Sequence, residues 1–220
     1  MNTGGMKRFF FNCFGAVAFL FAFSLVPISH AQGNTVVEYE PCELPKIRTD
    51  QRPDPGGPPT KVSVGVRMFD LTEINDVKQT LTGDFIVRMT WTDPRLAEFA
   101  GCKVPLAAVW SPRIDFVNSG RRFPRFPDLV EIGAGGKVQY LQRYTGPMAT
   151  YHNLKNFPFD TQEFRIWLAS LEYSENQVQL VVDEKITGRR KLLNITDWTI
   201  DGVKGKIDRM FAEAFGQFQS

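Results

Sequence analysis

The feature that most constrains the fold is the strict alternation of side chains from Thr80 to Asp93. Residues 85, 87, 89 and 91 are large and apolar, and residues 84, 88, 90 and 92 are polar. A period of two indicates a strand with one buried face. Ile86 alone interrupts the polar face.

Further short segments show the same character between turn signals. Strands are expected at 62–71, 129–132, 138–144, 162–171, 178–183 and 198–206, and the glycines of Gly133–Gly136 predict a hairpin. Asn75 and Asp76 predict a turn after the first strand. No long helical period occurs outside the N-terminal leader. The chain is therefore expected to form an all-β, antiparallel, immunoglobulin-like sandwich of about ten strands.

Residues 1–31 are interpreted as a signal peptide. Lys7 and Arg8 precede an almost wholly apolar run, and Ser29-His30-Ala31 suits signal peptidase. The alternative is an uncleaved membrane anchor, since the run approaches spanning length. Either reading predicts an exported chain.

Residues 32–60 contain six prolines and a Gly-Gly pair, which predict an extended linker before a domain at 61–220. After the leader only Cys42 and Cys102 remain. In an oxidising compartment they either pair or stay as two thiols, and the sequence leaves both alternatives open.

Composition and spacing nominate no catalytic site, metal site or cofactor. The formal charge of +2 is accounted for by Lys7 and Arg8, so no basic stripe indicates nucleic acid. Only His30 and His152 occur, which disfavours histidine-based metal or triad chemistry. Asp183 and Glu184 are interpreted as a solvated strand end. We expect a protein that is not an enzyme.

Three motifs, in order, resemble the extracellular ligand-binding domain of pentameric ligand-gated ion channels, the Cys-loop receptor superfamily. They are Trp91–Leu96 (WTDPRL), Val109–Asn118 (VWSPRIDFVN) and Asn156–Gln162 (NFPFDTQ). Segments 138–141 and 198–200 are most similar to the bacterial branch. The two cysteines that name the superfamily would fall at Thr150 and Phe164, so that bridge is missing, as is common in bacterial members.

The resemblance implies a ligand site between subunits. The principal face would supply residues of three loops, A to C, and the complementary face residues of loop D. The implied principal residues are Phe116, Val117, Asn118, Leu171, Tyr173, Phe211 and Phe215. The implied complementary residues are Ile86 and Arg88. Leu171 and Ile86 stand where receptors for quaternary ammonium ligands have tryptophan, which disfavours such a ligand there.

Arg88 suggests a small carboxylate instead, because a guanidinium can hold a carboxylate with two parallel hydrogen bonds. The alternative is a solvent-facing strand arginine. Proton sensing is a second possibility, with Glu73 or Asp76 as the carboxylates to consider.

The resemblance also implies a homopentamer that couples ligand binding to a transmembrane pore. The coupling loops would contain Asp76, Pro158, Phe159 and Asp160. The chain is expected to stop near loop C, before the strand that returns from it, as a truncated subunit at the periplasmic or extracellular face of the membrane. The alternative is a secreted, pore-less pentameric binding protein.

Overall fold

The structure is a computed structural model that describes residues 42–118, 123–151, 161–212 and 216–219. The chain divides into two compact units, Met1–Tyr39 and Glu40–Ser220, and all described residues belong to the second. The expected signal peptide lies outside the described residues, as do Pro158, Phe159, Asp160 and Phe215.

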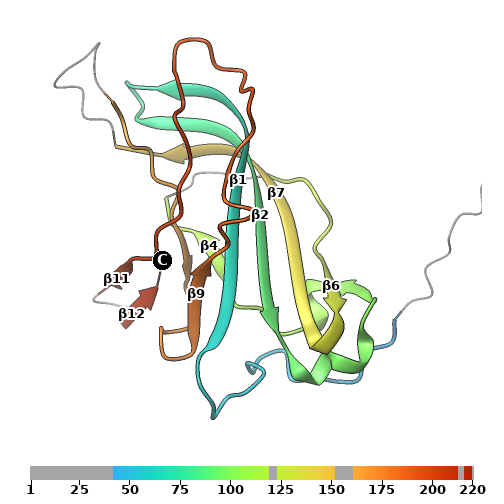
Figure 1. The fold of residues 1–220 in the computed structure, drawn as a ribbon. Coiled ribbons are helices and arrows are strands. Elements are labelled where there is room, and N and C mark those ends of the chain that lie inside the picture. The colour runs from blue at the N-terminus through green and yellow to red at the C-terminus, as the bar shows by residue number, and fades with distance from the viewer. Residues whose placement is uncertain (1–41, 119–122, 152–160, 213–215, 220) are drawn as a thin grey trace, which may run out of the picture. The chain divides into compact units, whose positions relative to one another are not determined.

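Three long antiparallel strands form the centre of the fold: β1 (Thr60–Asn75), β2 (Thr80–Thr92) and β7 (Lys137–Ala149). They run side by side along the body (Figure 1). β2 lies between the other two, with Ile86 opposite Arg67 of β1 and opposite Arg143 of β7. Every second residue of β2 from Leu81 to Trp91 is buried, which confirms the alternation expected from the sequence.

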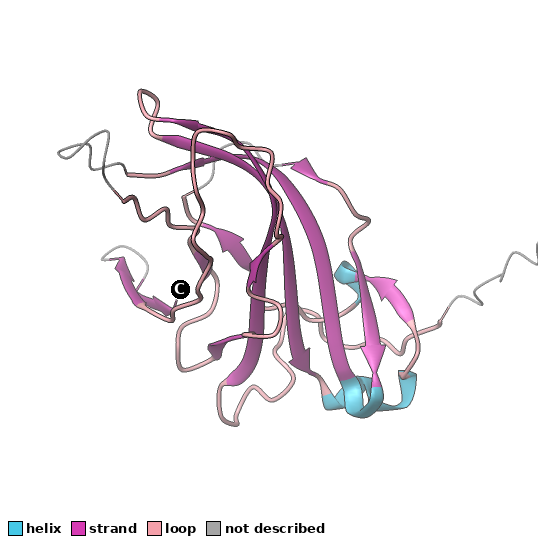
Figure 2. Ribbon diagram, turned by 45° about the horizontal axis from the view of Figure 1, so that its top comes forward, coloured by secondary structure: helices cyan, strands magenta, loops and turns pink. Residues whose placement is uncertain are grey.

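Shorter strands extend and cover this sheet (Figure 2). The main sheet runs β10-β1-β2-β7-β6-β3, with β9 also paired to β1 and β5 to β7, and β4-β8 and β11-β12 form two separate pairs. The bounds are β3 (Lys103–Pro105), β4 (Ile114–Phe116), β5 (Phe123–Pro124), β6 (Leu129–Gly133), β8 (Leu168–Ser170), β9 (Val178–Val182), β10 (Gly188–Arg189), β11 (Arg209–Ala212) and β12 (Gly216–Gln219).

The all-β fold class is confirmed, but the sheet is mixed. β9 and β10 both pair with β1 in parallel. The expected hairpin at Gly133–Gly136 is present, with the 3-10 turn η3 (Ala134–Gly136) between β6 and β7. The described residues contain two other helical segments, also 3-10: η1 (Pro94–Phe99) and η2 (Leu106–Ala108). No helix in the described part of the chain is long and apolar enough to cross a bilayer.

The two motif tryptophans lie in the core. Trp91 and Trp110 are 2% and 0% exposed, and their rings meet edge to face with centroids 6.2 Å apart. Asp93 of the first motif is fully buried and accepts hydrogen bonds from both the backbone and the side chain of Arg95. Arg95 in turn donates to the carbonyls of Arg48 and Gln51. The WTDPRL motif thus fastens the N-terminal segment to the end of β2.

A linker was expected over 32–60; residues 32–41 lie outside the described residues, and residues 42–60 are packed against the domain. Leu44 and Ile47 pack against the core, and Arg52 is buried. Arg52 donates to the carbonyls of Pro55, Gly57 and Pro58 over 2.6–3.0 Å. A single guanidinium therefore supplies the hydrogen bonds that the proline-rich turn cannot make within itself. Cys42 and Cys102 form a disulfide with Cα atoms 5.8 Å apart, which ties the same segment to the body.

Two expected strands differ from the structure: one is shorter than expected, and the other is absent from the described residues. Of 162–171 only Leu168–Ser170 is a strand, because the preceding backbone bonds to the side chain of Asn118 rather than to a neighbouring strand. Segment 198–206 forms no strand. There the ring of Trp198 packs on Phe164, with centroids 5.6 Å apart, and Gly205 lies directly over Val182. A Cβ at Gly205 would come within 2.4 Å of Val182, so this segment contacts its neighbours by side-chain packing and not by strand hydrogen bonds.

The residues at which the chain was expected to stop near loop C include two short paired strands. β11 and β12 pair antiparallel, with Arg209 opposite Gln219 and Ala212 opposite Gly216.

Candidate functional site

The segments expected to form loops A and B lie together. β4 and β8 pair antiparallel, which places Phe116 opposite Leu168 and Ile114 opposite Ser170. Asn118 reinforces this junction. Its Nδ2 donates to the carbonyls of Ala149 and Arg165 over 2.8 and 2.6 Å, and its Oδ1 accepts from the Trp167 amide over 2.9 Å. Asn118 therefore acts as a positioning residue that joins three segments.

Apolar side chains are exposed beside this junction. Val117, Trp167 and Leu171 are 38%, 44% and 49% exposed. Phe116, by contrast, is buried and meets Tyr144 edge to face. Tyr173 is half-buried and its hydroxyl accepts a hydrogen bond of 2.9 Å from the indole of Trp110. Among the expected principal-face residues whose side chains the structure describes, Val117 and Leu171 are thus exposed, while Phe116 and Tyr173 contribute to packing beneath.

Ile86 and Arg88 lie on the opposite side of the sheet from the buried residues of β2. Arg88 Nη2 donates to Asp183 Oδ2 over 2.6 Å, and the two side chains are 27% and 13% exposed. The hydrogen bond from Arg88 lowers the pKa of Asp183 below its ordinary value. Asp183 also accepts from the backbone of Lys185. The interpretation of Asp183 as a solvated strand end is therefore wrong, because β9 pairs with β1 and brings this carboxylate over Arg88.

A second ion pair lies beside the first. Arg143 of β7 donates to both carboxylate oxygens of Asp84, with Nε 2.8 Å from Oδ1 and 3.0 Å from Oδ2. This bond raises the pKa of Arg143. The guanidinium groups of Arg143 and Arg190 lie 5.0 and 5.4 Å from the centre of the Phe69 ring. On this side of the sheet, Arg88 and Arg143 therefore have acidic partners, and the Arg67 guanidinium donates to the carbonyls of Ile186 and Arg189.

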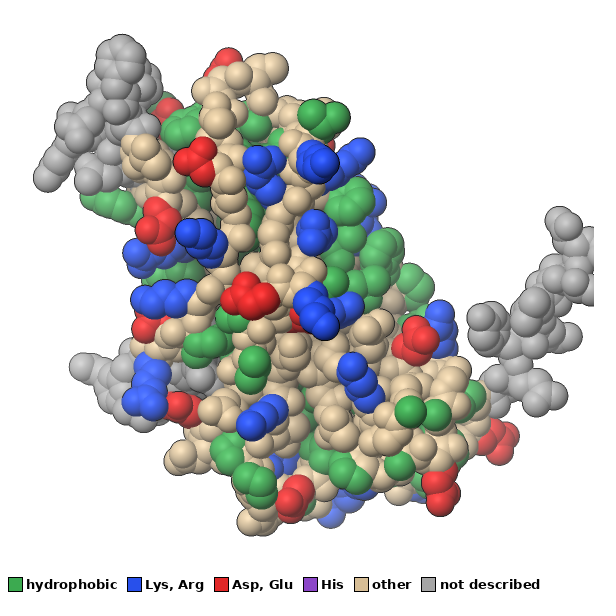
Figure 3. Space-filling model, in the orientation of Figure 1, with side chains coloured by type: hydrophobic (Ala, Val, Ile, Leu, Met, Phe, Trp, Pro, Cys, Tyr) green, Lys and Arg blue, Asp and Glu red, His purple; other side chains and the backbone are tan. Residues whose placement is uncertain are grey.

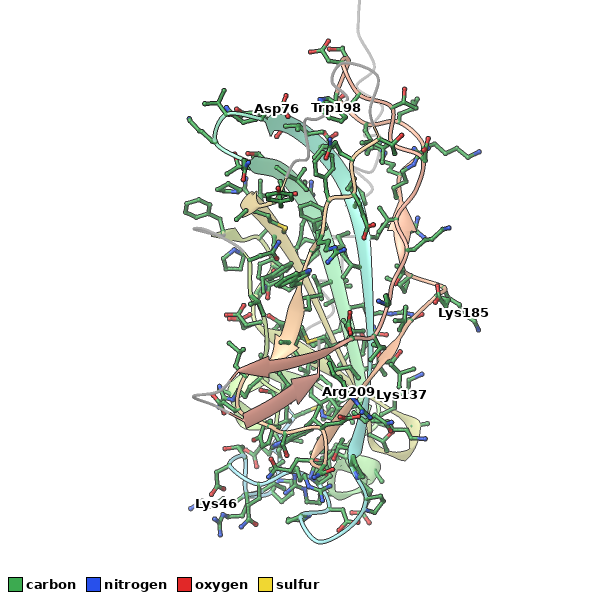
Figure 4. All side chains as sticks on the ribbon, turned by 90° about the vertical axis from the view of Figure 1, so that its left-hand side faces the viewer. Lys46, Asp76, Lys137, Lys185, Trp198 and Arg209 are labelled. Carbon is green, nitrogen blue, oxygen red and sulfur yellow. A yellow bond between two sulfur atoms is a disulfide. The ribbon has the colours of Figure 1, made fainter. Side chains whose placement is uncertain are left out.

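The loops implied in coupling are only partly described. Asp76 lies at the turn between β1 and β2, at the same end of the body as Trp198 and at the end opposite Lys46 (Figure 4). Pro158, Phe159 and Asp160 lie outside the described residues. In the hairpin β11–β12, Phe211 falls on β11, and Arg209 forms an ion pair of 3.1 Å with Glu175.

Sequence reasoning did not identify Asp183 as the partner of Arg88, and it did not single out Trp167. A carboxylate at a strand end carries no local sign of its partner, since Arg88 lies 95 residues away in the chain. Trp167 lies inside the segment 162–171 that was expected to be a strand, and its exposure appears only in the structure. Across the part of the chain that the structure describes, no group of three or more His, Cys, Asp or Glu could hold a metal ion. Figure 3 shows acidic and basic side chains mixed over one face.

Residues 44–214 match the family model described as the neurotransmitter-gated ion-channel ligand binding domain, which covers more than half of the chain. The chain belongs to this family. The family consists of ligand-binding domains of ion channels and not of enzymes. Two of the three sequence motifs have clear structural roles. Trp91–Leu96 fastens the N-terminal segment to the end of β2, and Val109–Asn118 connects the buried Trp110 to the β4–β8 junction.

Curated relatives agree with this assignment. The chain is 28% identical over 151 residues to a proton-gated ion channel of Gloeobacter violaceus, covering 65% of this chain and 42% of the relative. It is 31% identical over 138 residues to a gamma-aminobutyric acid receptor alpha-like protein of Drosophila melanogaster, covering 58% and 20%. A gamma-aminobutyric acid receptor subunit pi of Rattus norvegicus is 27% identical over 137 residues, covering 58% and 31%. The chain spans less than half the length of each of these relatives.

Proposed function

We propose that the domain senses a small carboxylate at the contact between two neighbouring copies and couples its binding to a transmembrane pore. Arg88 is the observation that carries this proposal. It lies on the outward face of β2, partly exposed, and already holds one carboxylate, that of Asp183. The same guanidinium geometry suits the carboxylate of a ligand.

Asp183 positions Arg88 and also competes for it. Its Oδ2 takes the Nη2 donor of the guanidinium. Among the described residues, Arg88 Nε is buried and has no hydrogen-bond partner. A ligand carboxylate that shifted the guanidinium could use Nε and Nη2 together as a planar fork. Binding would then release Asp183, a charge that is only 13% exposed and needs a new partner.

The neighbouring copy would supply the surface formed by Val117, Trp167 and Leu171. These apolar side chains are exposed beside the β4–β8 junction, and Asn118 keeps the junction in register. Such a contact joins two different surfaces of the chain, so five copies can close it into a ring. We place Asp76, Pro158, Phe159 and Asp160 at the contact with a pore domain in the longer protein. We also place residues 1–31 as the leader that exports the domain to the periplasmic or extracellular side.

Support for the carboxylate comes from the relatives named as gamma-aminobutyric acid receptors, and support for the bacterial branch from the Gloeobacter channel. That channel is named as proton-gated, which favours protons as a second candidate stimulus. The Arg88–Asp183 pair favours the carboxylate over protons as the stimulus, because Arg88 holds the pKa of Asp183 below its ordinary value. Mild acid would therefore leave this pair charged.

Calorimetric titration of the chain with γ-aminobutyrate and acetate tests the proposal. The unaltered chain and the control Lys103→Gln should bind with equal affinity, since Lys103 is 52% exposed and pairs with Glu131. Arg88→Ala should weaken binding at least tenfold, by the loss of a charge-assisted hydrogen bond pair. Equal binding by Arg88→Ala would refute Arg88 as the anchor. A secreted, pore-less binding protein would give the same titration but no ligand-gated current in membranes.

A further inference from the structure

Residues 183–194 lie along β1 as a strap. Asp183, its first residue, donates its amide to the carbonyl of Val64 over 2.8 Å, and β10 within the strap pairs with β1 in parallel. Asn194, its last residue, donates its amide to Asp70 Oδ1 over 2.8 Å. Because Val64 and Asp70 follow each other in that order along β1, the strap runs towards the end of the body that carries the β1–β2 turn.

Two arginines of the outward face hold the first part of the strap. Arg88 donates to the Asp183 carboxylate over 2.6 Å. Arg67 donates from Nε to the carbonyl of Ile186 over 3.2 Å and from Nη1 to that of Arg189 over 3.4 Å. Both guanidinium groups therefore bind oxygen atoms of the strap, one a carboxylate and the others backbone carbonyls.

The second part of the strap is held by the backbone and side chains of β1. The Arg190 amide donates to the carbonyl of Met68 over 2.9 Å, and the Arg190 guanidinium lies 5.4 Å from the centre of the Phe69 ring. The Asn194 side chain donates from Nδ2 to Asp70 Oδ2 over 2.6 Å. Polar and charged groups thus fasten the strap along its whole length.

No residue of the strap is buried, since each is exposed or half-buried. Ile186 lies directly over Gly65, where a Cβ would come within 2.6 Å of the Ile186 Cβ. Within this fully described segment only Leu193, which is half-buried, packs against the hydrophobic core. A segment with exposed hydrogen bonds and few buried apolar contacts opens locally at a lower free energy than the core does. The strap can therefore leave β1 while the sheet stays folded.

We propose that binding of a carboxylate ligand releases this strap from β1, an inference that rests on the proposed function of Arg88. The ligand and Asp183 compete for one guanidinium, so the ligand binds the released state and shifts the population towards it. The strap then leaves β1 along its whole length, as far as Asn194. Release at Asn194 changes the contacts of β1 next to the turn that contains Asp76, which the proposed function places against a pore domain.

Competition for Arg88 has a reciprocal consequence. Any change that loosens the strap must strengthen carboxylate binding by up to the same factor. Asn194→Ala removes one hydrogen bond at the far end of the strap and should tighten γ-aminobutyrate binding about two- to tenfold. Leu192→Ala is the matched control, because Leu192 lies in the same strap and is 82% exposed, and its affinity should be unchanged.

Hydrogen exchange of the unaltered chain measures the release itself. The amides of Asp183, Arg190 and Asn194 all donate to β1. Saturating γ-aminobutyrate should speed the exchange of all three at least about fivefold, because release removes their acceptors. The Ile132 amide, which donates to the carbonyl of Cys102 near the other edge of the main sheet, should exchange at an unchanged rate.

The outcomes separate the strap from the proposed function. Calorimetric binding of γ-aminobutyrate without faster exchange of the strap amides would overturn the release and leave the role of Arg88 standing. Equal affinities of the Asn194→Ala and Leu192→Ala chains would overturn it as well.

Absence of γ-aminobutyrate binding would instead refute the proposed function, and the strap is then tested without ligand. Asp183→Asn should speed the exchange of the Arg190 and Asn194 amides in the free chain, because the strap is expected to leave β1 as a whole. Faster exchange confined to the amide of residue 183 would overturn the proposal.

Discussion

Replacing Asp183 by asparagine should destabilise the domain by about 2 kcal/mol, and the reasoning starts from its burial. Asp183 and Arg88 are 13% and 27% exposed, so their pair lies between a surface pair and a buried one. Surface pairs contribute about 0–1 kcal/mol, whereas breaking a buried pair costs about 3–5 kcal/mol. Asparagine keeps the shape and most of the hydrogen bonding, which places the expected loss near the middle. For a domain of this size the melting temperature should fall by about 4–8 °C.

The pH dependence gives the sign of the effect. The folded-state pKa of Asp183 is lowered, so its stabilisation is fully present above the unfolded pKa of about 4 and is lost as the pH falls through the lower, folded value. The gap in unfolding free energy between the unaltered chain and Asp183→Asn should therefore stay constant from pH 8 to pH 5. It should close below about pH 4.

Urea unfolding followed by tryptophan fluorescence measures this gap. Asp50→Asn is the control, because Asp50 and its partner Arg48 are both 65% exposed, and no resolvable change is expected. A cycle with Arg88→Ala should show that the two substitutions are not additive. The reasoning would be refuted if Asp183→Asn unfolded at the same urea concentration as the unaltered chain at pH 7, or if the gap widened in acid.

Three other perturbations have expected outcomes. Reducing the Cys42–Cys102 disulfide should lower the free energy of unfolding by about 2–4 kcal/mol. Urea unfolding with and without dithiothreitol measures the change. An unchanged urea midpoint would contradict the role of the disulfide in fastening the N-terminal segment. Gly136→Ala should lower the melting temperature more than Gly135→Ala does. Both glycines have positive φ, but only at Gly136 would a Cβ come within 2.0 Å of a backbone oxygen. Equal melting temperatures of the two variants would contradict this. Asn118→Ala should cost about 1–2 kcal/mol and speed hydrogen exchange of the amide bonded to its Oδ1, and unchanged exchange would argue against the junction.

Sequence reasoning anticipated the parts of the fold that are encoded locally. The burial of β2 follows its alternation residue by residue, and the Gly133–Gly136 hairpin follows from turn chemistry. Sequence reasoning failed where side-chain contacts take the place of hydrogen bonds between strands. Asn118 satisfies the backbone before β8, and Trp198 packs on Phe164 where a strand was expected. Such contacts join residues distant in the chain, so no window of sequence reveals them.

The candidate site was anticipated in part for the same reason. The motif around Asn118 drew attention to the segment whose side chain bonds to the backbone before β8, and Arg88 was singled out by residue type and position. The ligand-binding roles of both stay predictions. The carboxylate that holds Arg88 comes from the end of β9, which reaches it only through the parallel pairing with β1.

The most direct test of the central claim asks whether Ile86 of one copy meets Leu171 of its neighbour. A mixture of Ile86→Cys and Leu171→Cys chains should form disulfide-linked dimers under mild oxidation, and the double variant should form a ladder ending at five copies. A mixture of Lys103→Cys and Leu171→Cys chains measures random collisions. If the Ile86 and Leu171 mixture gave no more linked dimer than this control, the site between copies would be contradicted.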